Sequence, residues 1–161
     1  MSVSGKPLLC DLNDCHLTLN FMPNQDKVRG LPFGRKVRMK LIGHSEHEFV
    51  QCFLVDILDE SVGKLMKNKC PHITVSFNRK RCRPQYSNTV LNDGKVVSLL
   101  NDCDKDEKAG KRTKELVVEG TVGAQYSNSS VTFENPYSFH SIKEAFAFRK
   151  KHGMCRLQIK L

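Results

Sequence analysis

The sequence predicts an α+β fold that is predominantly antiparallel β, with a helix near the C-terminus. Many of its apolar residues alternate with polar ones, which is typical of strands with one buried face. Gly, Pro, Asn and Asp separate these stretches and favour turns. At 161 residues, of which 39% are hydrophobic, the chain is long enough to form a single domain with a core of its own.

Four strands are predicted in the first half of the chain. A flexible lead-in over residues 1–13 precedes the first strand, Cys15–Phe21, in which polar and apolar residues alternate. Lys36–Ile42 alternates cations and hydrophobes, and Phe49–Ile57 is rich in β-branched and aromatic residues. These two segments should therefore form a hairpin, and Pro71–Phe77 is the fourth predicted strand.

The connections between these strands are polar. The hairpin turn Gly43–Glu48 contains His44 and His47 beside two glutamates, which raises the question of a metal site. Nothing nearby supplies a clear fourth ligand, so the two histidines are interpreted as solvated residues and no cofactor is expected. Asp59–Lys69 is predicted to be a polar linker.

The second half is predicted to contain shorter elements. In order, they are a short helix over 84–91, a turn at 92–94, a mobile polar loop over 101–113, strands over 116–124 and 130–133, a helix over 141–152 and a closing strand over 154–161. The C-terminal helix has the clearest limits. The segment from Ser141 to Glu144 has the form of a capping box, and Gly153 can adopt the left-handed conformation that ends a helix.

The cysteines and the apolar runs indicate an intracellular protein. The seven cysteines are odd in number and form no Cys-x-x-Cys pair, which argues against a disulfide framework and against a structural zinc site. No apolar run approaches the roughly 18 residues that span a bilayer, and no signal peptide follows Met1. We therefore expect a cytoplasmic or nuclear monomer without a membrane partner.

Two of the predicted strands carry the same motif. Residues 16–19 (His-Leu-Thr-Leu) and 72–75 (His-Ile-Thr-Val) each place a histidine and a threonine two residues apart. Side chains alternate between the faces of a strand, so each histidine shares a face with its threonine and the apolar residues lie on the other. One strand supplies half of a site, and we therefore expect the two strands to lie near each other.

This set of side chains suits the hydrolysis of a cyclic phosphodiester. Two histidines with ordinary pKa values near neutrality, His16 and His72, can divide the roles of general acid and general base. The hydroxyls of Thr18 and Thr74 can donate hydrogen bonds to phosphate oxygens as negative charge develops. Such a mechanism requires no metal ion, and the motif does not indicate which histidine is the acid.

The chain is strongly basic, which indicates a polyanionic partner such as RNA. Its formal net charge is +9. The densest positive run directly follows the second motif, and aromatic residues on either side of the run could stack on bases. The predicted RNA- and phosphate-binding residues are Arg79, Lys80, Arg81, Arg83, Phe77 and Tyr86.

The paired motifs resemble the His-x-Thr motifs of the two-histidine phosphoesterase superfamily. Within it, residues 14–126 are most similar to the cyclic phosphodiesterase domain of plant- and fungal-type tRNA ligases. The similarity includes the approach to Pro-His-Ile-Thr-Val and a downstream Asn88-x-x-Leu91-x-x-Gly94 pattern. The resemblance implies a two-lobed fold with a central cleft.

The same resemblance implies an activity and roles for the motif residues. The activity is metal-independent hydrolysis of RNA 2′,3′-cyclic phosphate ends to a 2′-phosphate and a 3′-hydroxyl, as in RNA repair or tRNA splicing. His16 and His72 would be the acid and the base, and Thr18 and Thr74 the phosphate ligands. The chain shows no P-loop kinase signature and no nucleotidyl-transferase lysine motif, so separate RNA ligase or kinase proteins would carry out those steps.

Three other interpretations stay open at this point. The substrate could be a small cyclic nucleotide or ADP-ribose cyclic phosphate instead of RNA. The same cleft could bind a terminal phosphate of RNA without catalysis. The chain could also be an interaction protein whose charge only keeps it in solution.

Overall fold

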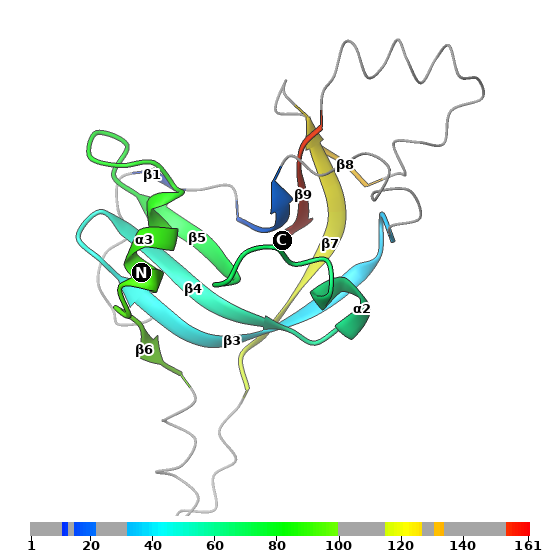
Figure 1. The fold of residues 1–161 in the computed structure, drawn as a ribbon, viewed down its shortest axis with the longest axis horizontal. Helices are drawn as coiled ribbons and strands as arrows, with labels where there is room; N and C mark the ends of the chain where they lie inside the picture. Colours follow the sequence, from blue (N-terminus) through cyan, green and yellow to red (C-terminus); the bar gives the residue numbers. More distant parts are fainter. Residues whose placement is uncertain (1–10, 13–14, 22–31, 100–114, 127–130, 134–153) are drawn as a thin grey trace, which may run out of the picture.

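A computed structural model describes residues 11–12, 15–21, 32–99, 115–126, 131–133 and 154–161. Within them, nine strands form one antiparallel sheet and two short helices pack against it (Figure 1). The strands are β1 (Asp11–Leu12), β2 (His16–Phe21), β3 (Lys36–Glu46), β4 (Val50–Ile57), β5 (His72–Phe77), β6 (Val97–Ser98), β7 (Val117–Tyr126), β8 (Val131–Thr132) and β9 (Met154–Lys160). The helices are α2 (Glu60–Gly63) and α3 (Tyr86–Asn92).

Six of these strands close on one another to form a barrel. The order around the ring is β3, β4, β5, β2, β9 and β7, and β7 pairs back with β3 from Lys36↔Thr121 to Lys40↔Val117. Figure 1 shows β2 and β9 side by side in this ring, although they come from opposite ends of the chain. The three short strands β1, β6 and β8 pair with β5, β3 and β7, respectively.

The interior of the barrel is the main hydrophobic core. All six ring strands contribute buried side chains to it, and α2 adds one more. The buried members are Leu17, Leu19, Val37, Met39, Val55, Val62, Ile73, Val122, Leu157 and Ile159. Full burial of a side chain of this kind contributes about 1.5–3 kcal/mol, so the apolar face of each strand is held inward. The polar residues that alternate with them therefore face outward.

The two-lobed α+β architecture predicted from the sequence is wrong. The described residues form a closed antiparallel barrel instead of two lobes around a central cleft, and their two helices are short and flank β5 in the sequence. Closure requires β3 to pair with β7 and β2 with β9, and alternation along one strand does not show which partner it takes. The helix predicted over 141–152 and the loop predicted over 101–113 lie outside the described residues.

Most of the predicted strand positions are confirmed. β2, β4, β5, β7, β8 and β9 begin and end within two residues of the predicted segments, and α3 overlaps the predicted short helix. The predicted turn over Gly43–Glu48 is wrong for most of its length. β3 continues to Glu46, because this segment pairs with β4 and, at His44, with β6. Within the predicted lead-in, Asp11–Leu12 forms β1 against β5.

Asp59 explains why a helix interrupts the predicted linker. Its carboxylate accepts hydrogen bonds from the backbone N–H groups of Ser61 (3.1 Å) and Val62 (3.3 Å) and forms an ion pair with Arg35 at 2.8 Å. The hydrogen bond from the Ser61 hydroxyl is the largest of the effects that lower the pKa of Asp59. An N-cap of this kind satisfies amide donors that a helix start leaves unpaired. The short helix then places Val62 in the barrel core.

A β-bulge in β5 brings α3 against the outside of the barrel. Val75 has no partner in β4, because the register between the two strands moves from Thr74 directly to Ser76. The extra residue shifts the alternation of the strand. In a regular strand, residues three apart point to opposite faces. Because of the bulge, Thr74 and Phe77 both point toward α3, where Thr74 contacts Ser87 and Phe77 packs against Val90.

Gly120 is required where β7 closes the ring. It pairs with Val37 of β3, and on its other side the chain of β9 approaches closely. A Cβ atom at this position would lie 2.5 Å from Cγ2 of Ile159 and 2.8 Å from the backbone oxygen of Lys160. A side chain here would therefore push β9 away from β7.

We predict that Gly120→Ala lowers the free energy of unfolding by about 1–3 kcal/mol, because the backbone of β9 must move to admit the methyl group. Urea unfolding followed by circular dichroism measures this change. Gly63→Ala is the matched control, since a Cβ atom there has no neighbour within 4 Å and α2 should gain up to about 1 kcal/mol from alanine. Equal stability of the two variants would contradict the close packing of β7 and β9.

Candidate active site

The two His-x-Thr strands are neighbours in the barrel. β2 pairs with β5 antiparallel, with Leu17 opposite Ile73, and both of these side chains lie in the core. The flanking positions then place His16 across from Thr74, and Thr18 across from His72, on the outer face. Directly opposed residues on one face of an antiparallel pair have Cβ atoms about 4.5–5.5 Å apart. The arrangement is thus a quadrilateral with a histidine and a threonine on each strand.

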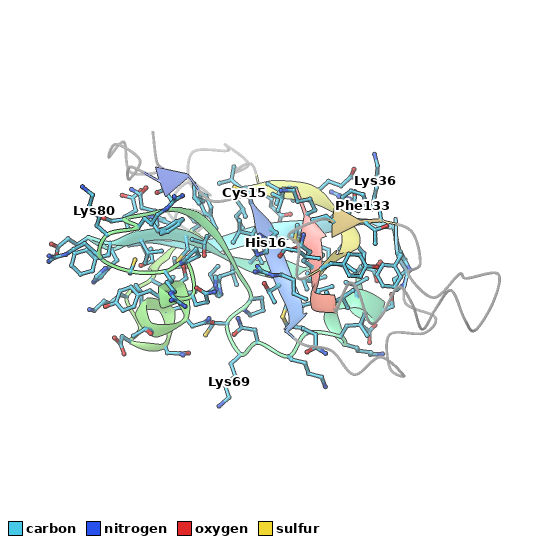
Figure 2. The ribbon with its side chains drawn as sticks, turned by 90° about the horizontal axis from the view of Figure 1, so that it is seen from above. Cys15, His16, Lys36, Lys69, Lys80 and Phe133 are labelled. Carbon is cyan, nitrogen blue, oxygen red and sulfur yellow. The ribbon has the colours of Figure 1, made fainter. Side chains whose placement is uncertain are left out.

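A cavity of about 550 Å³ lies over this outer face, and all four predicted catalytic residues line it. Its walls come from β2, β5, β7 and β9, from the segment before β5, and from the start of α3. The lining residues are His16, Thr18, Leu19, Asn20, Lys67, Asn68, His72, Thr74, Pro84, Gln85, Asn88, Gln125 and Arg156. Figure 2, which looks down on the molecule, shows His16 near the middle of the fold.

His72 is oriented by a backbone carbonyl. Its Nδ1 lies 2.7 Å from the carbonyl oxygen of Cys70, so Nδ1 carries a proton and donates it to this oxygen. Nε2 is then the nitrogen that can exchange a proton with a bound molecule. Burial lowers the pKa of His72, and the hydrogen bond to Cys70 opposes that lowering.

His16 is held in its neutral form by burial and by Arg156. Nη1 of Arg156 lies within hydrogen-bonding distance of Nε2 of His16, and because a guanidinium can only donate, Nε2 must accept. Burial, the charge of Arg156 and the neighbouring His72 together lower the pKa of His16 to about 4. The two imidazoles of the site therefore differ in their partners and in their tendency to hold a proton.

The two threonines also differ in their surroundings. Thr18 is partly exposed in the cavity wall, whereas Thr74 is only 5% exposed. The hydroxyl of Thr74 is 2.8 Å from that of Ser87 in α3 and 3.4 Å from the carbonyl oxygen of Pro84. The fully buried Ser87 thus fixes the direction of the Thr74 hydroxyl. The thiol of Cys52, opposite Thr74 on β4, also interacts with Ser87, and burial raises the pKa of Cys52 to about 11.

A chain of amide hydrogen bonds links α3 to His72. Nδ2 of Asn68 donates to Oδ1 of Asn88 at 3.0 Å, and Oδ1 of Asn68 accepts from the backbone N–H of Cys70 at 3.2 Å. Cys70 in turn accepts from His72. Sequence reasoning missed Asn68 and Arg156 as site residues. Arg156 does occupy the polar face of the alternating strand over 154–161, but its pairing with β2 could not be read from that pattern.

The predicted RNA-binding residues do not line this cavity. The four basic ones, Arg79, Lys80, Arg81 and Arg83, are exposed in and after the turn that follows β5. Figure 2 shows Lys80 at one end of the molecule, well away from His16 in that view. Phe77 is 8% exposed and belongs to the hydrophobic cluster under α3, so it is not available for stacking on a base.

An aromatic cluster lies beside this basic turn. The rings of His47 and Tyr86 meet edge to face with centroids 5.5 Å apart, and Phe49 lies next to both. The guanidinium of Arg81 stands 5.0 Å above the ring of Phe49. Nδ1 of His47 accepts a hydrogen bond from the backbone N–H of Phe49, so this histidine is part of the local packing.

Two further features of the described residues bear on the site. No group of three or more His, Cys, Asp or Glu side chains that could hold a metal ion gathers within them. None of the helices in this part of the chain is long and apolar enough to cross a membrane.

The family model described as the fungal tRNA ligase phosphodiesterase domain matches residues 35–126, which is more than half of the chain. This match confirms the resemblance seen in the sequence. It includes His72 and Thr74, whereas His16 and Thr18 precede it and β9 follows it. No curated protein and no solved structure matches the chain.

The lowered pKa of His16 predicts a specific pH dependence of stability. Between its ordinary value of 6.5 and about 4, the unfolded chain binds a proton at His16 that the folded protein does not. The stability that depends on neutral His16 is therefore complete above about pH 6.5 and is lost as the pH falls toward 4. Urea unfolding at about pH 7.5 and pH 5 should show a larger loss for the natural chain than for His16→Gln. Equal losses would contradict the buried, neutral state of His16.

Proposed function

The chain belongs to the family of the fungal tRNA ligase phosphodiesterase domain, and from this membership we propose that it hydrolyses 2′,3′-cyclic phosphate ends of RNA. The family supports phosphodiesterase activity in general and a connection with tRNA ligation or splicing. The proposal of this specific reaction rests on one observation. The register of β2 and β5 brings two histidines and two threonines into one cavity. The product would be a 2′-phosphate and a 3′-hydroxyl.

His16 is the general base in this proposal and His72 is the general acid. A base must be neutral, and burial together with Arg156 keeps His16 in that form. An acid must hold a proton. Burial lowers the pKa of His72, the carbonyl of Cys70 opposes this lowering through Nδ1, and the anionic phosphate of a bound substrate would further favour the protonated ring. Nε2–H of that ring is then the proton available to a leaving oxygen.

The reaction makes one bond to phosphorus and breaks another. Nε2 of His16 takes a proton from a water molecule as the water oxygen bonds to phosphorus. The bond from phosphorus to the 3′ oxygen breaks on the opposite side, and His72 gives its proton to that oxygen. The hydroxyls of Thr18 and Thr74 donate to the non-bridging oxygens, where negative charge increases. Thr74 has one proton, so it turns this proton from the carbonyl oxygen of Pro84 to the phosphate while its oxygen accepts from Ser87. Proton exchange with solvent then returns His16 to its neutral and His72 to its protonated form.

RNA is the proposed substrate because the cavity and the basic turn can act together. A volume of about 550 Å³ is within the range of sites for small molecules, so the cavity can take a terminal nucleotide. The exposed turn with Arg79, Lys80 and Arg81 offers positive charge to the phosphates of the adjoining nucleotides. Pro84 and Gln85, which directly follow this turn, line the cavity. Separate ligase or kinase proteins would act before or after this step.

A small cyclic nucleotide is the second candidate substrate. The observation that favours it is that the four basic residues of the turn lie outside the cavity, so the reacting groups do not require them. The two candidates differ in one measurable respect. With RNA, kcat/KM for an oligonucleotide exceeds that for a mononucleoside 2′,3′-cyclic phosphate and falls steeply with salt.

We predict that the chain opens a 2′,3′-cyclic phosphate at the end of an oligonucleotide in the presence of a chelator. His16→Ala and His72→Ala should each lower kcat/KM by at least about 100-fold, because each removes a proton transfer from the transition state. Chromatography of the products gives the rates and shows on which oxygen the phosphate remains.

His44→Gln is the matched control for this experiment. His44 lies on β3 and does not line the cavity, so its replacement should leave the rate unchanged. If the natural chain binds the RNA in a salt-sensitive manner but does not open the ring, the catalytic proposal is overturned and a binding module is favoured. Unchanged rates in both alanine variants would remove the two histidines from the mechanism.

A further inference from the structure

We propose that Arg156 binds the substrate phosphate and gates the base: in this structure it covers Nε2 of His16, and on binding it transfers to the anionic oxygens and uncovers that nitrogen. The inference rests on the proposed function, because it assumes that a phosphate enters this cavity. It adds a residue from β9, beyond the part of the chain that the family model matches.

The position of Arg156 makes the contact with His16 unusual. On β9, the residue opposite His16 is Lys160, whereas Arg156 lies opposite Phe21 at the other end of β2. Successive strand residues rise about 3.3 Å, so the side chain of Arg156 must run along the strand to reach the imidazole. Its guanidinium nevertheless ends on Nε2 of His16 and lines the cavity.

The chemistry of this contact prevents His16 from acting as a base. Arg156 is always charged and has five N–H donors but no acceptor, so it can contact Nε2 only through the lone pair of the neutral imidazole. The same lone pair has to accept the proton of the attacking water. Both interactions cannot occupy it at once, and Arg156 must leave before the proton is transferred.

A phosphate supplies the reason for Arg156 to leave. Guanidinium and phosphate form paired, charge-assisted hydrogen bonds, which are roughly twice as strong as bonds between neutral groups. The cavity already offers Thr18 and Thr74 to such an anion, so the phosphate and the guanidinium are brought to the same place. Exchange of a neutral imidazole for an anion is favourable for Arg156.

The same exchange alters the electrostatic surroundings of His16. In the part of the chain that the structure describes, the charged or titratable groups that face it are His72 from β5, Arg156 and Lys160 from β9, and Lys67 from the segment before β5. Arg156 and His72 both disfavour a proton on His16. An anion between them reverses this effect, so His16 gains basicity when the substrate is bound. Its proton affinity is thus linked to occupation of the site.

The experiment follows the imidazole resonances of His16 by NMR during pH titration, with and without inorganic phosphate. In the natural chain, phosphate should raise the pKa of His16. In Arg156→Gln, that pKa should already be higher without phosphate, and the affinity for phosphate should fall about 10-fold or more. Arg156→Lys keeps the charge but lacks the paired donors, so its affinity for phosphate should lie between those of the natural chain and Arg156→Gln. Arg38→Gln, on the exposed face of β3, should behave as the natural chain does.

The outcomes separate this inference from the proposed function. A phosphate-induced rise that requires Arg156 supports the gate even if no cyclic phosphate is hydrolysed, and the catalytic proposal alone then fails. If Arg156→Gln binds phosphate as tightly as the natural chain and leaves the titration of His16 unchanged, the gate is overturned. The gate is also overturned if phosphate does not change the pKa of His16 in the natural chain. This outcome does not depend on the folding of any variant.

Discussion

The register that sets Leu17 of β2 opposite Ile73 of β5 is the constraint on which the site depends. Both side chains lie in the barrel core, and a slip of one residue in either strand would turn its apolar set outward and its histidine inward. The hydrophobic effect therefore keeps the two His-x-Thr faces on the outside and next to each other. Closure of the ring by β9 then adds Arg156 to the same face, and the bulge in β5 brings α3 over Thr74. Packing thus assembles the polar groups that a phosphodiester requires.

The two equivalent motifs lie in different environments, so the two histidines differ in their tendency to hold a proton. His72 donates to a carbonyl whose residue is held by Asn68, and this partner favours the protonated ring. His16 accepts from a guanidinium, and this partner favours the neutral ring. Two histidines on a repeated motif can therefore divide acid and base roles that the motif itself does not distinguish. Because the partner of His16 is a guanidinium in the cavity wall, the proposed gate would make the binding of an anion and the release of the base one event.

The sequence was sufficient to predict most of the strands and the four His-x-Thr residues that share the cavity, because alternation is a local property and the His-x-Thr pattern occurs twice. Most strand limits are confirmed, and His16, Thr18, His72 and Thr74 do meet in one cavity. The barrel was not predicted, since its closure by β3 with β7 depends on partners far apart in the chain. Arg156 and Asn68 were missed for the same reason, as each reaches the site through a long-range contact. Phe77 was assigned to RNA binding because it borders the basic turn, whereas its ring is buried against Val90 of α3, and this packing cannot be read from the strand alone.

The most direct test of the central claim is a crystal structure of the chain with a nucleoside 2′-monophosphate, the terminal group of the proposed product. The account predicts that the phosphate lies between His16 and His72, within about 2.6–3.2 Å of both Nε2 atoms, with the two threonine hydroxyls on its oxygens and Arg156 moved from His16 to the anion. A phosphate bound at the turn of Arg79–Arg83, or one that touches a single histidine and leaves Arg156 on His16, would contradict it.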